Sequence, residues 1–318
     1  NEWDRMAPIN IGVTAGIESN RVSPVWVEKS NYMNKVITIS KHSKDGFMNA
    51  VFQGHNKETG QPMSLKMQTE VDVVGYPVKD YEESQIELKL EHDFNYLAVA
   101  QWGPRKNLSK IIKWFVEENY DQEVGLIIKT SIKNNSIVDR SYAAQLIHDT
   151  LSDSPKDRKC KIYLLHGDLT EQEMHAVYNH DKVKCLVSLT HGEGFGLPLF
   201  EAAYSGLPVI APGWSGQCDF LFAPSQTKSK NKKKKNVLKP FFAKVDFTIG
   251  PVPESAVWPG VIEKDTMWCY PSEGSYKLRL RQVRKEYNKW LERASYLKSW
   301  VREEFNKDKI YSSLCDSI

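Results

Sequence analysis

Residues 191–216, HGEGFGLPLFEAAYSGLPVIAPGWSG, decide the fold, because they place a glycine-rich turn, a short helix and a strand in direct succession. The apolar run CLVSLT before them, residues 185–190, predicts one strand, and LPVIAP, residues 207–212, predicts the next. Glycines between the first strand and the helix allow the backbone to turn sharply and to approach a ligand closely. Strands joined through helices in this way form a parallel, doubly wound sheet.

The same alternation extends over most of the chain. The first half predicts strands at 9–13, 35–40 and 70–78, and helices that begin after Ser23 and Ser40, the second one running to residue 52. The second half predicts strands at 94–102, 124–130 and 161–167 and helices at 108–119, 142–151 and 170–180. Such sheets bind ligands beyond the carboxyl ends of their strands, so we expect a site at the turn after residue 190.

The length of 318 residues suits two α/β domains. Because the polar segment 79–93 favours a linker, we expect an N-terminal domain over residues 1–87 and a C-terminal domain over residues 88–296. A hydrophobic content of 41% and a charged content of 26% are those of a soluble globular protein. The sequence has no apolar stretch of the roughly 18 residues that cross a bilayer.

Cysteine usage indicates a reducing compartment. The five cysteines are scattered and never spaced CxxC, which disfavours both a disulfide framework and a structural zinc site. No basic-then-apolar signal pattern opens the chain, so we expect a cytoplasmic protein, with the inner face of a membrane as the alternative location. Because the chain begins at Asn1 and not at methionine, a longer parent chain stays an open alternative.

The turn itself predicts an anion site. A helix that begins near Leu197 directs its unpaired N–H groups and the positive end of its dipole into the crevice, where a phosphate fits best. Glu193 in the turn and Glu201 about one turn into the helix would repel that phosphate unless they bind hydroxyl groups instead. Because sugars and riboses supply such hydroxyls, the combination points to a nucleotide sugar.

Residues 193–211, EGFGLPLFEAAYSGLPVIA, resemble the Glu-x7-Glu signature of retaining glycosyltransferases with the GT-B fold, in glycosyltransferase family 4 (glycosyl transferases group 1). Residues 98–107, AVAQWGPRKN, resemble the strand and turn that bind the diphosphate in that family. The resemblance implies two Rossmann-like doubly wound domains that face a cleft, the N-terminal one abbreviated in this chain. It also implies a hexosyltransferase that retains the anomeric configuration and needs neither an obligatory metal nor a cofactor.

The same resemblance implies roles for individual residues. Glu193 and Lys106 take catalytic roles, the glutamate at the donor sugar and the lysine at the diphosphate, while Glu201 binds the ribose. The other donor-binding candidates are Arg105, Lys129, Gly194, Phe195, Gly196 and Leu197.

The C-terminal segment, residues 297–318, is expected from the resemblance to be a helix that crosses back to the N-terminal domain. The residues with a helical spacing suited to that contact are Leu297, Trp300, Val301 and Phe305.

The sequence departs from the family pattern at three places. Gln101 stands where the family usually has an arginine, and Arg105 is a cation that would compensate for it. Asp219 lies roughly where the family has a glutamate. Residues 14–16 occupy the region where the family often has a histidine close to the donor sugar.

Other candidates have more than one interpretation. His191 favours a structural or solvent-facing role over that of a general base, and Glu18 is either an exposed loop acid or an acid that reaches the cleft from the first domain. Trp258 and Trp268 are expected to be packing residues, with sugar stacking as the alternative, and Asn107 is a candidate cap for the helix that follows it.

The lysine-rich run at 228–236, KSKNKKKKN, is expected to be a solvated insertion loop. A contact with an anionic acceptor or with a membrane surface is the alternative role. The expected partners of the chain are a nucleoside-diphosphate sugar and a glycan, lipid or small-molecule acceptor. No nucleic acid is expected, because the run has no interleaved aromatic residues to stack on bases. Two rival functions stay open, a catalytically impaired nucleotide-sugar-binding module and a nucleic-acid-binding protein that uses the lysine run.

Overall fold

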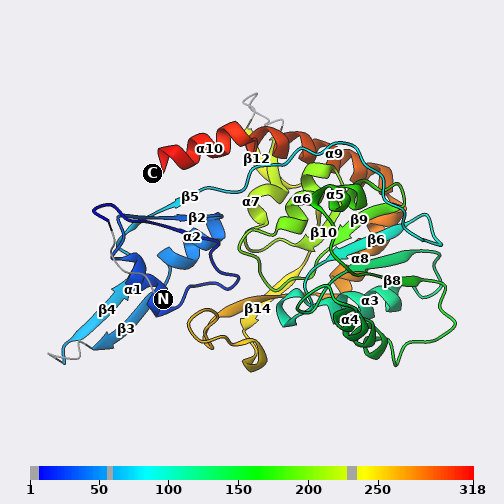
Figure 1. Ribbon diagram of the computed structural model, residues 1–318, viewed down its shortest axis with the longest axis horizontal. Coiled ribbons are helices and arrows are strands. Elements are labelled where there is room, and N and C mark those ends of the chain that lie inside the picture. The colour runs from blue at the N-terminus through cyan, green and yellow to red at the C-terminus, as the bar shows by residue number, and fades with distance from the viewer. Residues whose placement is uncertain (1–6, 56–59, 228–234) are drawn as a thin grey trace.

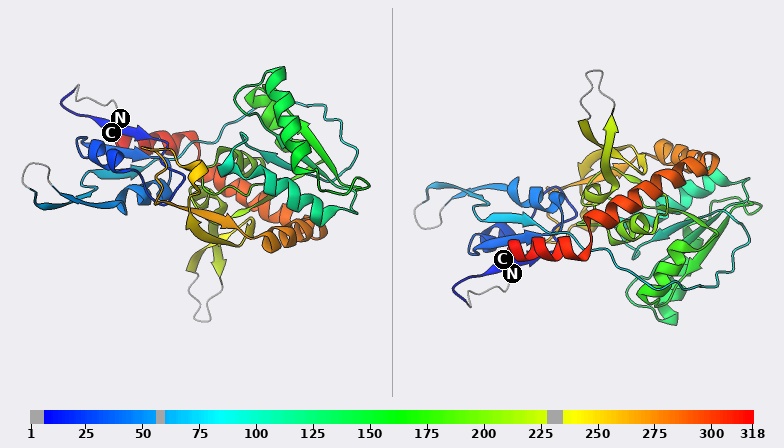
Figure 2. Two further views of the ribbon diagram at one scale, coloured as in Figure 1. Left: turned by 90° about the horizontal axis from the view of Figure 1, so that it is seen from below. Right: turned by 90° about the horizontal axis from the view of Figure 1, so that it is seen from above.

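The computed structural model describes residues 7–55, 60–227 and 235–318. Within that part, the chain forms two lobes, each built around a parallel sheet (Figures 1 and 2). Most of the lysine run at 228–236 lies outside the described residues, so the loop expected there and its alternative roles stay predictions.

The larger sheet confirms the predicted parallel, doubly wound arrangement. Its six strands lie in the order β13-β10-β9-β6-β7-β8. Their bounds are β6 Asn95–Val99, β7 Gly125–Lys129, β8 Lys161–Leu165, β9 Val183–Val187, β10 Val209–Pro212 and β13 Ala243–Val245. The chain adds β7 and β8 on one side of β6 and then returns to place β9 on the other side. The carboxyl ends of β6 and β9 therefore flank the switch point of the sheet, where doubly wound folds bind ligands.

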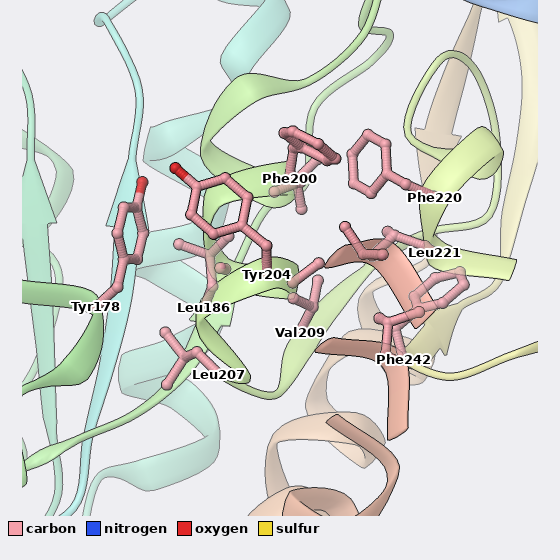
Figure 3. Packing of buried hydrophobic residues seen from close by; sticks show 14 of the residues in the cluster. Tyr178, Leu186, Phe200, Tyr204, Leu207, Val209, Phe220, Leu221 and Phe242 are labelled. Carbon is pink, nitrogen blue, oxygen red and sulfur yellow. The ribbon is translucent and has the colours of Figure 1, made fainter. Parts of the chain in front are cut away.

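Helices cover both faces of this sheet. One face carries α3 (Leu108–Asn119), α4 (Ile137–Thr150) and α8 (Glu273–Lys285), whose apolar side chains share one buried cluster. The other face carries α5 (Glu171–Asn179), α6 (Leu197–Ser205) and α9 (Tyr287–Glu304), and Figure 3 shows part of the cluster beneath them. A capping box formed by Thr170 and Glu173 starts α5. Beyond β10, α7 (Cys218–Leu221) leads into the hairpin of β11 (Phe222–Thr227) and β12 (Lys235–Pro240).

The smaller sheet has three parallel strands in the order β1-β2-β5. They are β1 Ile11–Thr14, β2 Lys35–Thr38 and β5 Glu70–Val73, and they are connected through α1 (Pro24–Ser30) and α2 (Lys41–Met48). Ser40 caps α2 as predicted, because its side chain accepts the N–H of Ser43. The helix predicted to reach residue 52 is wrong beyond Met48, since Val51 and Phe52 begin a strand instead. That strand, β3 (Val51–His55), pairs with β4 (Pro62–Lys66) in a hairpin that the sequence analysis missed.

A further hairpin, β14 (Phe247–Pro251) and β15 (Met267–Pro271), joins the two lobes. The loop between these strands contains the short 3-10 helix η2 (Glu254–Ala256). Trp268 is only 1% exposed and packs with the apolar core of the smaller lobe. The backbone of Met267 donates to the side chain of Asn20 at 2.7 Å, which fixes the hairpin to that lobe. Trp258, by contrast, is 65% exposed, so its predicted packing role is wrong.

The start of the linker contacts the junction of the two C-terminal helices. Residues 79–90 form no helix or strand, and the N–H of Val78 donates to the carbonyl of Phe305 at 2.7 Å. The single helix expected over 297–318 is two helices, because α9 ends at Glu304 and Asn306 caps a new one, α10 (Lys307–Asp316). Leu297 and Val301 lie in the core of the larger lobe.

It is therefore α10 that reaches the smaller lobe. It lies beside the smaller sheet in Figure 1, and Ser317 hydrogen-bonds to Asp72 of β5.

Replacing Trp268 with alanine should destabilise the protein by about 3–5 kcal/mol, because it leaves a large cavity in a core shared by two distant segments. Urea unfolding followed by circular dichroism measures this free energy. The matched control Trp258→Ala should change it by less than about 0.5 kcal/mol, since that side chain is exposed. Equal losses for the two variants would contradict a core that depends on the β14–β15 hairpin.

Candidate functional site

The glycine-rich turn after β9 is fixed from two sides. The N–H of Glu193 donates to Ser215 Oγ, and its carbonyl accepts the N–H of Gly216, both at 2.9 Å. A Cβ added to Gly216 would lie 2.1 Å from the carbonyl oxygen of Gly194, so only glycine permits this contact. Gly196 precedes α6 with φ of +95°, in the left-handed region. The turn is thus a rigid loop at the switch point, directly before the start of α6.

Glu193 is the buried charge of this loop. Its side chain is 9% exposed, and its carboxylate accepts Lys106 Nζ at 2.5 Å and Arg105 Nη1 at 3.0 Å. Burial by itself raises the pKa of Glu193, but the two cations outweigh burial and hold that pKa below its usual value. Glu193 is therefore a carboxylate at neutral pH. The sequence predicted each of these three residues separately, and the structure brings them together.

The two cations reach Glu193 because of the turn after β6. Pro104–Lys106 forms the 3-10 helix η1, and Asn107 follows it with φ of +59°. The side chain of Asn107 donates to the carbonyl of Leu189, and the carbonyl of Arg105 accepts the N–H of His191 at 2.8 Å. Asn107 thus stands before α3 without the side-chain capping bond that the sequence analysis expected. It ties the β6 turn to the β9 turn instead.

Glu201 lies in a different environment from Glu193. It projects from α6 toward α5, where Tyr178 donates its hydroxyl to the Glu201 carboxylate at 2.8 Å. Burial raises the pKa of Glu201, and the Tyr178 hydrogen bond opposes the rise only in part. The cavity beside it, of about 100 Å³, is also lined by Tyr81 of the linker, by Tyr204 and by Leu169 from the turn after β8.

The remaining donor-binding candidates are spread along the edge of the sheet. Lys129 at the end of β7 donates to the carbonyl of Gly167 at 2.7 Å, and Gln101 donates to the carbonyl of Ile132 at 2.7 Å. Neither contacts Glu193. Leu197 opens α6 and is exposed, whereas the ring of Phe195 is buried against Phe200 and Phe220. The Phe195 side chain is therefore part of the core, and only its backbone faces the turn.

The turns after β7 and β8 are fixed by a buried pair that the sequence analysis missed. Asp139 accepts His166 Nε2 at 2.9 Å, and it also accepts the N–H groups of Ile132, Lys133 and Asn134. Burial raises the pKa of Asp139, but His166 and the three N–H groups hold it well below its usual value. The sequence signal was available, because a polar residue at the third helical position often accepts N–H groups of the preceding loop.

The smaller lobe also reaches this edge. Glu18 forms an ion pair with Arg105 at 3.2 Å, so the interpretation in which this acid reaches the cleft holds. Asp219 accepts the N–H of Lys41 at 2.8 Å, at the positive end of α2, and burial raises its pKa. His191 has the structural role that the sequence favoured: its ring stacks on Trp268 at 5.3 Å, and its Nδ1 lies 2.5 Å from the carbonyl oxygen of Cys269.

The part of the chain that the structure describes contains neither a metal-binding cluster nor a membrane-spanning helix. No group of three or more histidine, cysteine, aspartate or glutamate side chains in it is arranged to hold a metal ion. Of the helices in residues 7–55, 60–227 and 235–318, none combines the length and the apolar character needed to span a membrane.

Part of the larger lobe matches a known family by sequence. Residues 80–227 match the family model described as glycosyl transferases group 1. This range includes both the turn after β6 and the turn after β9. The resemblance of the two motifs to glycosyl transferases group 1 is thereby confirmed. No curated protein matches the chain by sequence.

Solved structures show the GT-B fold of the chain. TarM of S. aureus, solved with fondaparinux, α-GlcNAc-glycerol and UDP, has a TM-score of 0.56 and 15% identity over 97% of this chain and 50% of its own. Sucrose-phosphate synthase from Thermosynechococcus elongatus has a TM-score of 0.58 and 12% identity over 92% of this chain and 59% of its own. A glycosyltransferase from Rickettsia africae has a TM-score of 0.61 and 9% identity over 96% of this chain and 69% of its own. The chain thus spans about half the length of TarM.

Replacing Asp139 with asparagine should lower the melting temperature at pH 7, because the amide cannot accept all the N–H groups that the carboxylate accepts. The folded pKa of Asp139 lies below its unfolded value of about 4, so its stabilisation is complete above pH 4 and declines as the pH falls further. The difference in melting temperature between wild type and Asp139→Asn should therefore shrink between about pH 4 and pH 2. Asp149→Asn, on the exposed end of the same helix, is the control. A difference that stays constant with pH would contradict the assigned charge.

Proposed function

We propose that this chain, which carries a glycosyl transferases group 1 domain over residues 80–227, binds a nucleoside-diphosphate sugar and transfers the sugar to a hydroxyl acceptor. In this proposal the anomeric configuration is retained and no metal ion is required. The observation that supports it best is the meeting of Glu193, Lys106 and Arg105 at the switch point of the sheet, beside the start of α6.

The cations serve the leaving group. Breaking the anomeric bond builds positive charge on the sugar ring and negative charge on the departing diphosphate. Lys106 and Arg105 stabilise that negative charge, together with the N–H groups in the first turn of α6. Fixed cations of this kind supply the electrostatic role that a divalent metal would otherwise fill. The leaving phosphate then takes the proton of the acceptor hydroxyl, so the mechanism needs no separate side-chain base.

The two glutamates serve the two rings of the donor. Glu193 lies next to the cations and accepts hydroxyl groups of the transferred sugar. Glu201 lies farther along α6, beside a cavity that the turn after β8 also lines, and accepts the ribose hydroxyls. Lys129 and the backbone of Gly194, Gly196 and Leu197 complete the donor site at the edge of the sheet. Because the TarM structure contains UDP, uridine diphosphate is the first nucleotide to test on this chain. The acceptor is a glycan, a lipid or a small molecule.

A catalytically impaired nucleotide-sugar-binding module is the second candidate. It is favoured by Gln101, which takes the place of a family arginine and hydrogen-bonds to a backbone carbonyl. Release of free sugar from the donor, or transfer of sugar to any acceptor, would exclude this candidate.

Substituting the two glutamates separates their roles. Glu201→Gln should lower the affinities for a nucleoside diphosphate and for its sugar nucleotide by similar factors, because both ligands contain the ribose. The expected loss is on the order of 10- to 150-fold, since a hydrogen bond to a charged group is worth about 1.5–3 kcal/mol. Glu193→Gln should leave the affinity for the nucleoside diphosphate unchanged or stronger, since Lys106 is released, while it lowers affinity for the sugar nucleotide or its turnover. Calorimetric titration of both variants with both ligands measures these affinities.

Melting temperatures of the two variants without ligand serve as the folding control. If Glu193→Gln weakens the plain nucleoside diphosphate as much as Glu201→Gln does, the division of roles between the glutamates is wrong. If neither ligand binds the wild-type chain, the proposed function itself is wrong.

A further inference from the structure

A loop of the smaller lobe lies directly on the glycine-rich turn of the larger lobe. A Cβ added to Gly192 would lie 1.8 Å from the carbonyl oxygen of Glu18, and a Cβ added to Gly194 would lie 2.5 Å from that of Ala15. The loop is anchored below by Ile17, which is fully buried in the core of the smaller lobe. The position of the Glu18 backbone is therefore set by both lobes, and its carboxylate points to the cations of the site.

Arg105 is shared between the two lobes. Its guanidinium group donates to the Glu193 carboxylate at 3.0 Å and to the carbonyl of Gly192 at 2.7 Å, and it pairs with Glu18 at 3.2 Å. Together with Lys106, the cluster holds two cations and two carboxylates, so its charges balance. A diphosphate that enters this cluster brings further negative charge, and it must compete with a carboxylate for a guanidinium group that binds either anion well.

The burial of Glu193 and of Glu18 indicates which of the two carboxylates a diphosphate displaces more easily. The Glu193 side chain is 9% exposed, and its backbone is hydrogen-bonded on both sides to residues 215 and 216. The Glu18 side chain is 27% exposed and is bound to the cluster through Arg105. Displacing Glu18 into water therefore costs less than displacing Glu193, because a buried carboxylate without a partner is strongly unfavourable.

We propose that Glu18 occupies the place of a donor phosphate on Arg105, and that a diphosphate binds by displacing it. This inference rests on the proposed function for the identity of the ligand, but its chemistry is that of any diphosphate. Glu18 is thus a residue of the smaller lobe that sets the affinity of the donor site by competition.

Substituting Glu18 with glutamine tests the competition. Calorimetric titrations of wild type and Glu18→Gln should use inorganic pyrophosphate, uridine diphosphate and uridine. We expect affinities for pyrophosphate and uridine diphosphate to rise, by roughly fivefold for the loss of one partly exposed ion pair. The affinity for uridine should not change, because it carries no phosphate. Asp265→Asn is the control: it removes the ion pair that joins Arg21 of the smaller lobe to the loop of the β14–β15 hairpin, away from the cations.

The outcomes distinguish this inference from the proposed function. Unchanged or weaker binding of both diphosphates by Glu18→Gln would overturn the competition. An equal gain in affinity for uridine, or an equal gain in the Asp265→Asn control, would also overturn it. Those results would indicate a general loosening of the structure and not the loss of a competing charge. If the variant gains affinity for pyrophosphate while uridine diphosphate binds no more tightly than pyrophosphate, the competition holds and the nucleotide assignment fails.

Discussion

The carboxylate of Glu193 is buried at a point where two turns and two lobes meet, and the rest of the site follows from the need to keep that charge paired. A buried carboxylate without a partner is very costly, so Lys106 and Arg105 must lie within hydrogen-bonding distance. Those cations come from the turn after β6, and Glu193 comes from the turn after β9. In the doubly wound sheet, the order of strand addition reverses between β6 and β9, which are parallel neighbours. The turns that follow these two strands therefore lie side by side at one edge of the sheet.

The close packing of backbone on backbone at this point explains the glycines. Gly192 and Gly194 face carbonyl oxygens of the smaller lobe, and Gly216 faces the carbonyl of Gly194. Side chains at Gly192 or Gly194 would push the lobes apart, and a side chain at Gly216 would disrupt the turn that carries Glu193. The hairpin β14–β15 also holds the lobes together, because Trp268 packs in the smaller lobe and stacks on His191 of the turn. The lobes are therefore held together at several points around one charged cluster.

The sequence predicted the larger sheet well because each of its central strands is a short apolar run bounded by helices of clear period. It also predicted Glu193, Lys106 and Arg105, since a specific motif and its turn mark them. It missed the β3–β4 hairpin, because the preceding helix was predicted to continue to residue 52. It also missed two features that depend on segments distant in the sequence, the packing of Trp268 in the other lobe and the Asp139–His166 pair. It placed Trp258 in the core and merged α9 with α10, because local periodicity does not show which lobe a side chain meets or that Asn306 caps a new helix.

The central claim is that the paired cations beside Glu193 bind a diphosphate. Calorimetric titration of Lys106→Met with uridine diphosphate and with uridine tests it most directly, because methionine keeps most of the unbranched side chain and removes its charged ammonium group. The account predicts that affinity for the diphosphate falls by about tenfold or more, as expected for one charge-assisted hydrogen bond, while affinity for uridine changes little. Equal losses for both ligands, with the melting temperature unchanged, would contradict it.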